Sequence, residues 1–164
     1  MTQVDDINLS FIKEDYFKNK LNEFLQYIFK LDLEIRSILL YGSVAIGKAK
    51  DDTEYLSDID LFIISDKITV DLLGRSNWVV NLTRSVSSGI QALWRTSMEM
   101  ESYANSKYYL ILDAFDEGRI LYDPDNFLHN LRERILTELK AKGVIKTDLY
   151  WQWPIKKFGD EIEY

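Results

Sequence analysis

Leu40-Tyr41-Gly42-Ser43 and Ser57-Asp58-Ile59-Asp60-Leu61 are the two segments from which the rest of this sequence can be interpreted. The apolar run from Ile35 to Tyr41 predicts a buried strand, which stops at Gly42-Ser43 because a glycine permits a turn or a close backbone approach. A second apolar run, Asp58 to Ile64, is short and rich in β-branched residues, and it predicts a second strand. The polar residues between the two runs, from Gly47 to Ser57, are therefore expected to form a loop.

Asp58 and Asp60 are candidate catalytic and metal-binding residues because they lie two apart at the start of a predicted strand. Alternate strand residues point to the same face of a sheet, so both carboxylates lie on one side. Two like charges this close repel each other unless a cation neutralises them or one of them is protonated. Mg²⁺ binds one or two carboxylates together with substrate phosphates, so the pair is typical of a metal-dependent site for a nucleoside triphosphate. The alternative interpretation is a pair of acids that face solvent at a strand end.

The Gly42-Ser43 turn supplies the second half of this candidate site. A glycine lets backbone N–H groups approach a phosphate closely, and the serine hydroxyl adds a further donor. The order of strand, Gly42-Ser43, loop and acidic strand is more specific than either pair alone, and it predicts a phosphate site beside a cation site.

The remaining hydrophobic pattern predicts an α/β (α+β) fold, with a small mixed β-sheet, helices packed on it, and a C-terminal helix and aromatic tail. Helices are expected over residues 15–31, 71–88 and 102–116, and strands over residues 93–100 and 119–122. Asp123-Pro124 is expected to provide the N-cap and first position of a last helix, with Gly143 beyond its end. We divide the chain into residues 1–123, the main domain, and residues 124–164, a helix and tail packed on the same domain.

The composition excludes several classes of function. The chain of 164 residues carries a net charge of −7, which argues against a broad nucleic-acid-binding surface. It contains no cysteine and a single histidine, His129, so thiolate chemistry and histidine-rich zinc sites are not expected. No segment is long and apolar enough to span a membrane, and the amino terminus lacks a signal-like pattern, so we expect a cytoplasmic protein.

The segment from Leu40 through Gly47 to Leu61 resembles the signature of the polymerase-β-like nucleotidyltransferase superfamily, above all its minimal nucleotidyltransferases. The resemblance implies the nucleotidyltransferase fold, with Gly42 and Ser43 holding the triphosphate of ATP, the substrate, and with Asp58 and Asp60 binding Mg²⁺ or Mn²⁺. It also implies transfer of AMP to a hydroxyl of a protein or other acceptor. Minimal nucleotidyltransferases often act with a HEPN-domain partner in toxin–antitoxin pairs. The tail from residue 150 to residue 163 resembles the ending of some archaeal members.

The sequence departs from the superfamily pattern at two places. Many members carry an arginine between the two glycines, where this chain has Val44, Ala45 and Ile46, so Lys48, or else Lys50, is the candidate phosphate-binding cation. Active members usually carry a third carboxylate on a neighbouring strand, for which Glu99 is the catalytic candidate and Glu101 the alternative; both also fit a solvated strand end.

These departures leave two hypotheses about function. The chain is either a nucleotidyltransferase or a catalytically weak or inactive module of the same fold that binds a partner protein. The sequence leaves open the acceptor, the preferred base and the oligomeric state, and it allows an oligomer.

Overall fold

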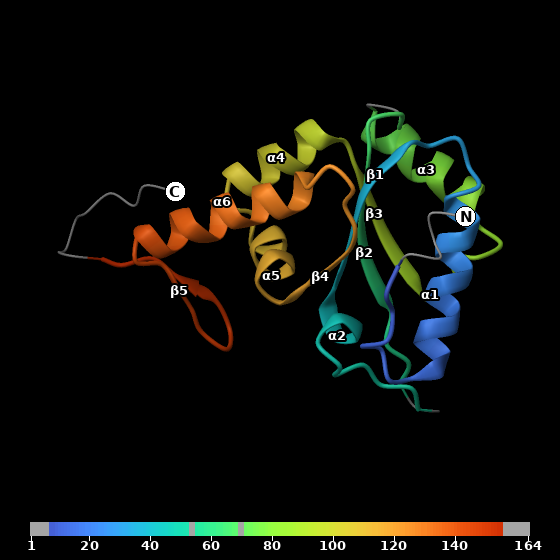
Figure 1. Cartoon of the computed structure of the whole chain (residues 1–164), viewed down its shortest axis with the longest axis horizontal. Helices are drawn as coiled ribbons and strands as arrows, with labels where there is room; N and C mark the ends of the chain where they lie inside the picture. The colour runs from blue at the N-terminus through green and yellow to red at the C-terminus, as the bar shows by residue number, and fades with distance from the viewer. Residues whose placement is uncertain (1–6, 53–54, 69–70, 156–164) are drawn as a thin grey trace.

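The computed structural model describes residues 7–52, 55–68 and 71–155, which form helices packed on both faces of a four-stranded sheet (Figure 1). The helices are α1 (Asp15–Ile28), α2 (Gly42–Ala45), α3 (Leu72–Thr83), α4 (Ser97–Asn105), α5 (Tyr109–Glu117) and α6 (Phe127–Ala141). The strands are β1 (Ile35–Tyr41), β2 (Ile59–Ser65), β3 (Ile90–Arg95), β4 (Arg119–Tyr122), β5 (Ile145–Lys146) and β6 (Trp151–Gln152). This architecture confirms the predicted α/β fold with a mixed sheet.

The sheet has the strand order β3-β2-β1-β4. The pairings of β1 with β2 and with β4 are antiparallel, whereas β2 and β3 run parallel. The register places Tyr41, the last residue of β1, beside Asp60, and Asp60 beside Gln91 of β3. One end of the sheet therefore brings together the start of β2, the end of β1 and the start of β3.

Two hydrophobic cores lie on opposite faces of the sheet. Odd-numbered residues of β2, such as Leu61, pack toward α1 and α3, and the even-numbered Phe62 and Ile64 pack toward α4, α5 and α6. In Figure 1 the two groups of helices flank the sheet in this way. β2 is covered on both faces, and its residues from Leu61 to Ile64 are accordingly all apolar, as expected for a central strand.

The early elements agree with the sequence-based prediction. The strand β1 covers the predicted range, and α1 ends at Ile28 instead of residue 31. The strand β2 begins one residue later than predicted and ends at Ser65. The helix α3 is shorter than predicted, because the chain leaves it at Thr83 and turns at Gly89, whose φ is +72°.

The prediction for residues 93–116 was wrong in its boundaries. The strand β3 ends at Arg95, and Thr96 caps α4 in a capping box in which its side chain accepts from the Glu99 N–H and Glu99 accepts from the Thr96 N–H. The signal was present in the sequence, since a threonine followed three residues later by glutamate is the signature of this motif. The helix that follows is interrupted at Lys107, whose φ is +55°.

The last helix, α6, begins at Phe127, three residues after Pro124. Asn126 is the N-cap residue, and its φ is +58°. Asp123 still caps the helix from a distance, because its carboxylate accepts hydrogen bonds from the backbone N–H groups of Leu128 and His129. Asp123 thus caps the helix as predicted, but it is not the N-cap residue itself. The proposed division at residue 123 stays a prediction.

The aromatic segment after α6 forms a short hairpin, β5 paired with β6. Trp151 donates its indole N–H to Asp113 of α5 at 2.9 Å, and Trp153 packs against the core on that side of the sheet. Residues 156–164, which include most of the segment compared with archaeal members, lie outside the described residues. No helix in the described part of the chain is long and apolar enough to cross a membrane.

Candidate functional site

The carboxylate pair lies at the end of the sheet where β1 finishes and β2 begins. Asp60 is the neighbour of Tyr41 in the β1–β2 register, and it has the same even-numbered phase as Phe62, so its side chain lies on the face of α4, α5 and α6. Asp58 directly precedes the strand. The structure therefore places both aspartates at one end of the sheet.

Ser57, the residue before Asp58, ends the preceding loop with two hydrogen bonds. Its backbone N–H donates to the carbonyl of Lys50 at 2.9 Å, and its hydroxyl accepts from the Lys50 N–H at 2.9 Å. Ser57 is buried, and the pair of bonds closes the loop at its base. These bonds hold the backbone directly before Asp58 in place.

Gly42 lies directly against the carboxylate of Asp60. A Cβ atom on Gly42 would lie 2.4 Å from Asp60 Oδ2, and the φ of Gly42 is +73°. Both features require glycine, because a side chain would collide with the carboxylate and a positive φ strains other residues. The glycine predicted to allow a close backbone approach does so here toward the carboxylate itself.

The environment of Asp60 is unfavourable for a negative charge. Burial and the neighbouring charge of Asp58 raise the pKa of Asp60 from 3.8 to about 6. Burial, together with the charge of Asp60, also raises the pKa of the Tyr41 hydroxyl. A site that holds two carboxylates at this cost is one in which a bound cation would be strongly favoured.

Gln91 is a site residue that the sequence analysis did not identify. It is the β3 partner of Asp60 in the register, and its side-chain amide donates to Asp58 Oδ2 at 2.7 Å. A neutral amide therefore occupies the neighbouring-strand position next to the aspartate pair. The parallel pairing of β2 with β3 reveals this residue, and the local sequence around it carries no signal.

Glu99 and Glu101 are not on the neighbouring strand. Both belong to α4, which begins after the opposite end of β3, beyond the pairing of Ile64 with Arg95. Glu99 forms two hydrogen bonds with the buried guanidinium of Arg75, at 2.7 and 3.0 Å. Burial alone would raise the pKa of Glu99, but the bonds from Arg75 and Thr96 lower it overall. The structure thus gives Glu99 a structural role and does not bring it to the aspartate pair.

The other predicted phosphate-binding residues lie in and after α2. Ser43 is in the first turn of this helix, and its carbonyl accepts from the Lys48 N–H at 2.8 Å, which holds the Gly47 turn together. The side chains of Lys48 and Lys50 are exposed, and the ammonium of Lys50 lies 5.9 Å from the ring centre of Tyr55. Gly42 and Ser43 therefore lie beside the carboxylates, while both lysines are at the solvent-facing loop.

Comparison with known protein families identifies the family of this chain. The family described as polymerase beta, nucleotidyltransferase matches residues 19–127, which contain the whole four-stranded sheet and the aspartate pair. The chain belongs to this nucleotidyltransferase family. No curated protein matches the chain.

Several solved structures are distantly similar to this nucleotidyltransferase. One is a toxin–antitoxin with AMP-PNP, at 15% sequence identity and a TM-score of 0.45, with 76% of this chain and 87% of the other covered. Another is a tri-AMPylated Shewanella oneidensis HEPN toxin in complex with MNT antitoxin, at 12% identity, the same coverage and the same TM-score. A third, the toxin-antitoxin MntA-HepT, is 11% identical, with a TM-score of 0.45 and 76% and 87% coverage. The family assignment rests on the sequence match.

The residues present fit a divalent cation in part. Asp58 and Asp60 offer carboxylate oxygens on one face, the ligand type that Mg²⁺ and Mn²⁺ prefer. Among the described residues there is no group of three or more acidic or histidine side chains placed to hold a metal. The protein thus contributes two carboxylates, and the remaining ligands of a cation would be water and substrate oxygens.

Proposed function

We propose that this nucleotidyltransferase transfers a nucleoside monophosphate, AMP from ATP in the simplest case, to a hydroxyl group of an acceptor protein. The observation that carries the proposal is the contact of Gly42 with Asp60, which joins the phosphate-binding turn to a carboxylate of raised pKa. This juxtaposition is unfavourable in the free chain, since it holds a partly buried carboxylate beside a second negative charge. A bound cation would offset this cost.

Each residue of the site has a defined role in this proposal. The backbone at Gly42 and the hydroxyl of Ser43 would bind phosphate oxygens, and Asp58 and Asp60 would hold Mg²⁺. Mg²⁺ bound there would neutralise charge on the triphosphate and the carboxylates. The acceptor oxygen forms a bond to the α-phosphorus while the bond from the α-phosphorus to the bridging oxygen breaks. Pyrophosphate leaves, and the hydroxyl proton passes to water.

The proposed acceptor is a HEPN-domain protein, with this chain as the antitoxin of the pair. The proposal follows the resemblance of residues 40–61 to minimal nucleotidyltransferases, and one distantly similar structure is that of an AMPylated HEPN toxin with its MNT antitoxin. A broad polyanion acceptor is disfavoured by the net charge of −7, because nucleic-acid backbones would be repelled. A cytoplasmic location agrees with an ATP-dependent reaction.

Calorimetric titration of ATP, with and without Mg²⁺, tests the nucleotide site. We expect Mg²⁺-dependent binding by the unmodified chain and its loss in the double variant Asp58→Asn/Asp60→Asn. The matched control is Glu23→Gln/Glu133→Gln, which also removes two negative charges but from exposed positions on α1 and α6. Binding that survives in the aspartate variant would contradict the proposed site.

The second candidate function is a non-catalytic module that binds a partner protein. Gln91 favours it, because the position beside Asp58 and Asp60 carries an amide and leaves the site with two acidic ligands among the described residues. Incubation with ATP radiolabelled at the α-phosphate, Mg²⁺ and a HEPN-domain protein separates the two candidates. Label on the acceptor supports transfer, whereas complex formation without label supports the binding module.

A further inference from the structure

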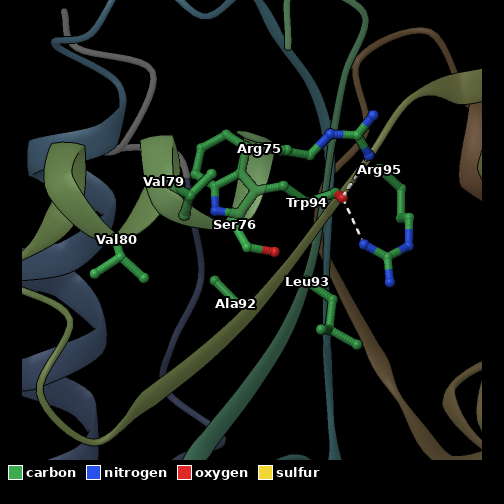
Figure 2. A pocket seen from close by; sticks show the side chains of 8 residues that line it. All are labelled: Arg75, Ser76, Val79, Val80, Ala92, Leu93, Trp94 and Arg95. Atoms are coloured by element: carbon green, nitrogen blue, oxygen red, sulfur yellow. Dashed lines mark hydrogen bonds between the residues drawn. The ribbon is translucent and has the colours of Figure 1, made fainter. Parts of the chain in front are cut away.

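A groove lies between α3 and the outer edge of β3, on the other face of the sheet from Asp60. It has a volume of about 350 Å³, and four residues of α3 and four of β3 line it (Figure 2). Its apolar wall includes Val79, Ala92 and the ring of Trp94, and Val80 at its rim is 60% exposed. An apolar wall beside a sheet edge is a surface that an extended chain can cover.

The edge of β3 that faces this groove is unpaired within the described chain. β3 pairs only with β2 among the described strands. The Trp94 carbonyl accepts from Arg75 at 3.3 Å and from Arg95 at 2.7 Å, so it points away from β2 (Figure 2). Because strand residues alternate in direction, the N–H and C=O of Ala92 and the N–H of Trp94 point outward too. These three groups are available to a further strand.

Two buried side-chain donors at the groove lack an acceptor. Trp94 is 2% exposed, and neither its indole Nε1 nor the Nε of Arg95 finds a hydrogen-bond partner in the described structure. A buried donor without an acceptor has lost its hydrogen bond to water with no replacement, so native proteins rarely retain one. Both atoms would gain from a ligand that brings oxygen acceptors.

Charge selects the kind of ligand. The guanidinium groups of Arg75 and Arg95 converge on the Trp94 carbonyl, and the bidentate pair with Glu99 neutralises one of them. The end of the groove at Arg95 therefore keeps a positive charge in a protein whose net charge is −7. A second copy of the chain paired through β3 would offer the strand Ile90–Arg95, which contains no acid.

The geometry points to this groove as a binding site for an acidic, extended segment of a partner protein, which adds to β3 as a fifth strand, places a carboxylate near Arg95 and brings a separate oxygen acceptor to the Trp94 indole. Main-chain bonds at Ala92 and Trp94 provide affinity, and the acidic side chain provides selectivity. The start of β3 lies beside the aspartate pair through Gln91 and Asp58. A chain bound along the edge would thus lead an acceptor toward that site, a consequence that rests on the proposed function.

The test is a selection of phage-displayed random peptides that bind the whole chain. The peptides have about eight residues, which is long enough to follow β3 at about 3.3 Å per residue. We expect enrichment of acidic sequences with alternating apolar residues. A synthetic peptide of an enriched sequence should shift the NMR signals of the Trp94 indole N–H and of the Ala92 and Trp94 amides.

Three variants and their controls make the result specific. Trp94→Phe, Arg95→Gln and Ala92→Pro should each weaken the enriched peptide about tenfold, the value of one lost hydrogen bond or ion pair. Trp78→Phe and Arg84→Gln, which alter residues outside the groove, should not. Proline is tolerated at an outward-facing edge position, and an unchanged amide spectrum elsewhere verifies the fold of that variant.

The remaining outcomes contradict the inference. Lack of acidic enrichment, shifts that map elsewhere, or a concentration-dependent dimer abolished by Ala92→Pro would each overturn it, the last by assigning the edge to a second copy. Asp58→Asn/Asp60→Asn should still bind the peptide. An unmodified chain that binds the peptide but not ATP would reject the proposed function alone, whereas one that binds ATP with Mg²⁺ but not the peptide would reject this inference alone.

Discussion

Gly42 and Asp60 are in such close contact that a single added carbon on the glycine would lie 2.4 Å from the Oδ2 atom of the aspartate. The two residues belong to the motif segments on either side of the loop, and the antiparallel pairing of β1 with β2 brings them together. This contact joins the proposed phosphate-binding turn to the carboxylate pair, and it provides a sharp test of the proposed site.

Gly42→Ala should lower the free energy of unfolding and remove Mg²⁺-dependent ATP binding. The positive φ costs about 1 kcal/mol for alanine, and the clash with Asp60 adds to it, for a total of roughly 2–3 kcal/mol. Gly47→Ala is the matched control, since Gly47 also has a positive φ, +68°, but a Cβ atom added there would meet no described atom within 4 Å. It should cost about 1 kcal/mol and leave ATP binding intact, as measured by denaturant unfolding and calorimetry. Equal effects of the two variants on binding would refute the contact's role.

Asp60→Asn should stabilise the Mg²⁺-free protein at pH 8. Because the pKa of Asp60 is raised from 3.8 to about 6 in the folded state, its charge opposes folding. The penalty grows as the pH rises from 3.8 to about 6 and is constant above that, so it is absent below pH 3.8. Allowing for the partial exposure of Asp60, we expect a gain of about 1–2 kcal/mol at pH 8.

Thermal unfolding from pH 3.5 to pH 8 measures this effect, with the exposed Asp116→Asn as the control. Addition of Mg²⁺ should stabilise the unmodified protein more than the Asp60→Asn variant. A variant that is less stable than the unmodified protein at pH 8 would show that the pair does not repel as the structure implies.

Gln91→Glu should raise the affinity for Mg²⁺ and lower the stability of the metal-free protein. The substitution places a third carboxylate beside Asp58 and replaces its hydrogen bond with a repulsion. We expect about a tenfold gain in Mg²⁺ or Mn²⁺ affinity by calorimetry, equivalent to about 1.4 kcal/mol. Gln26→Glu, on the exposed face of α1, adds the same charge far from the site and should change neither property. Unchanged metal affinity in Gln91→Glu would argue that Asp58 and Asp60 are not metal ligands.

Glu99→Gln should destabilise the fold and leave ATP binding unchanged. The substitution leaves Arg75, whose side chain is 3% exposed, without its ion-pair partner and weakens the cap of α4. The expected loss is about 2–4 kcal/mol, because an uncompensated buried charge is costly. Glu101→Gln, on the same helix and exposed, should change stability by less than about 0.5 kcal/mol.

The pH dependence of this ion pair has the opposite sign to that of Asp60. The pKa of Glu99 is lowered in the folded state, so its stabilising effect is present above pH 4.5 and is lost as the pH falls through the folded pKa. Chemical unfolding of both variants between pH 3 and pH 7 measures it. If Glu99→Gln abolished Mg²⁺-dependent ATP binding in protein that remained folded, Glu99 would regain the catalytic role that the sequence suggested.

The sequence by itself determined the elements whose signal is local. The apolar runs predict β1 and β2, the spacing of Phe17, Leu21 and Phe24 predicts α1, and the alternation of Asp58 with Asp60 predicts a shared face. Each of these follows from the fixed period of a strand or helix. The family motif is local for the same reason, because both halves lie at ends of consecutive strands.

Only the tertiary structure decided which residues from separate elements meet. The contact of Gly42 with Asp60 depends on the β1–β2 register, and the placement of Gln91 beside Asp58 depends on the parallel pairing of β3. The sequence-based prediction misplaced Glu99, because the capping box at Thr96 begins α4 where the prediction continued the strand. Glu99 is therefore a helix residue and not a strand residue. Register and strand order arise from the packing of the whole sheet between its two cores, which no short segment of sequence encodes.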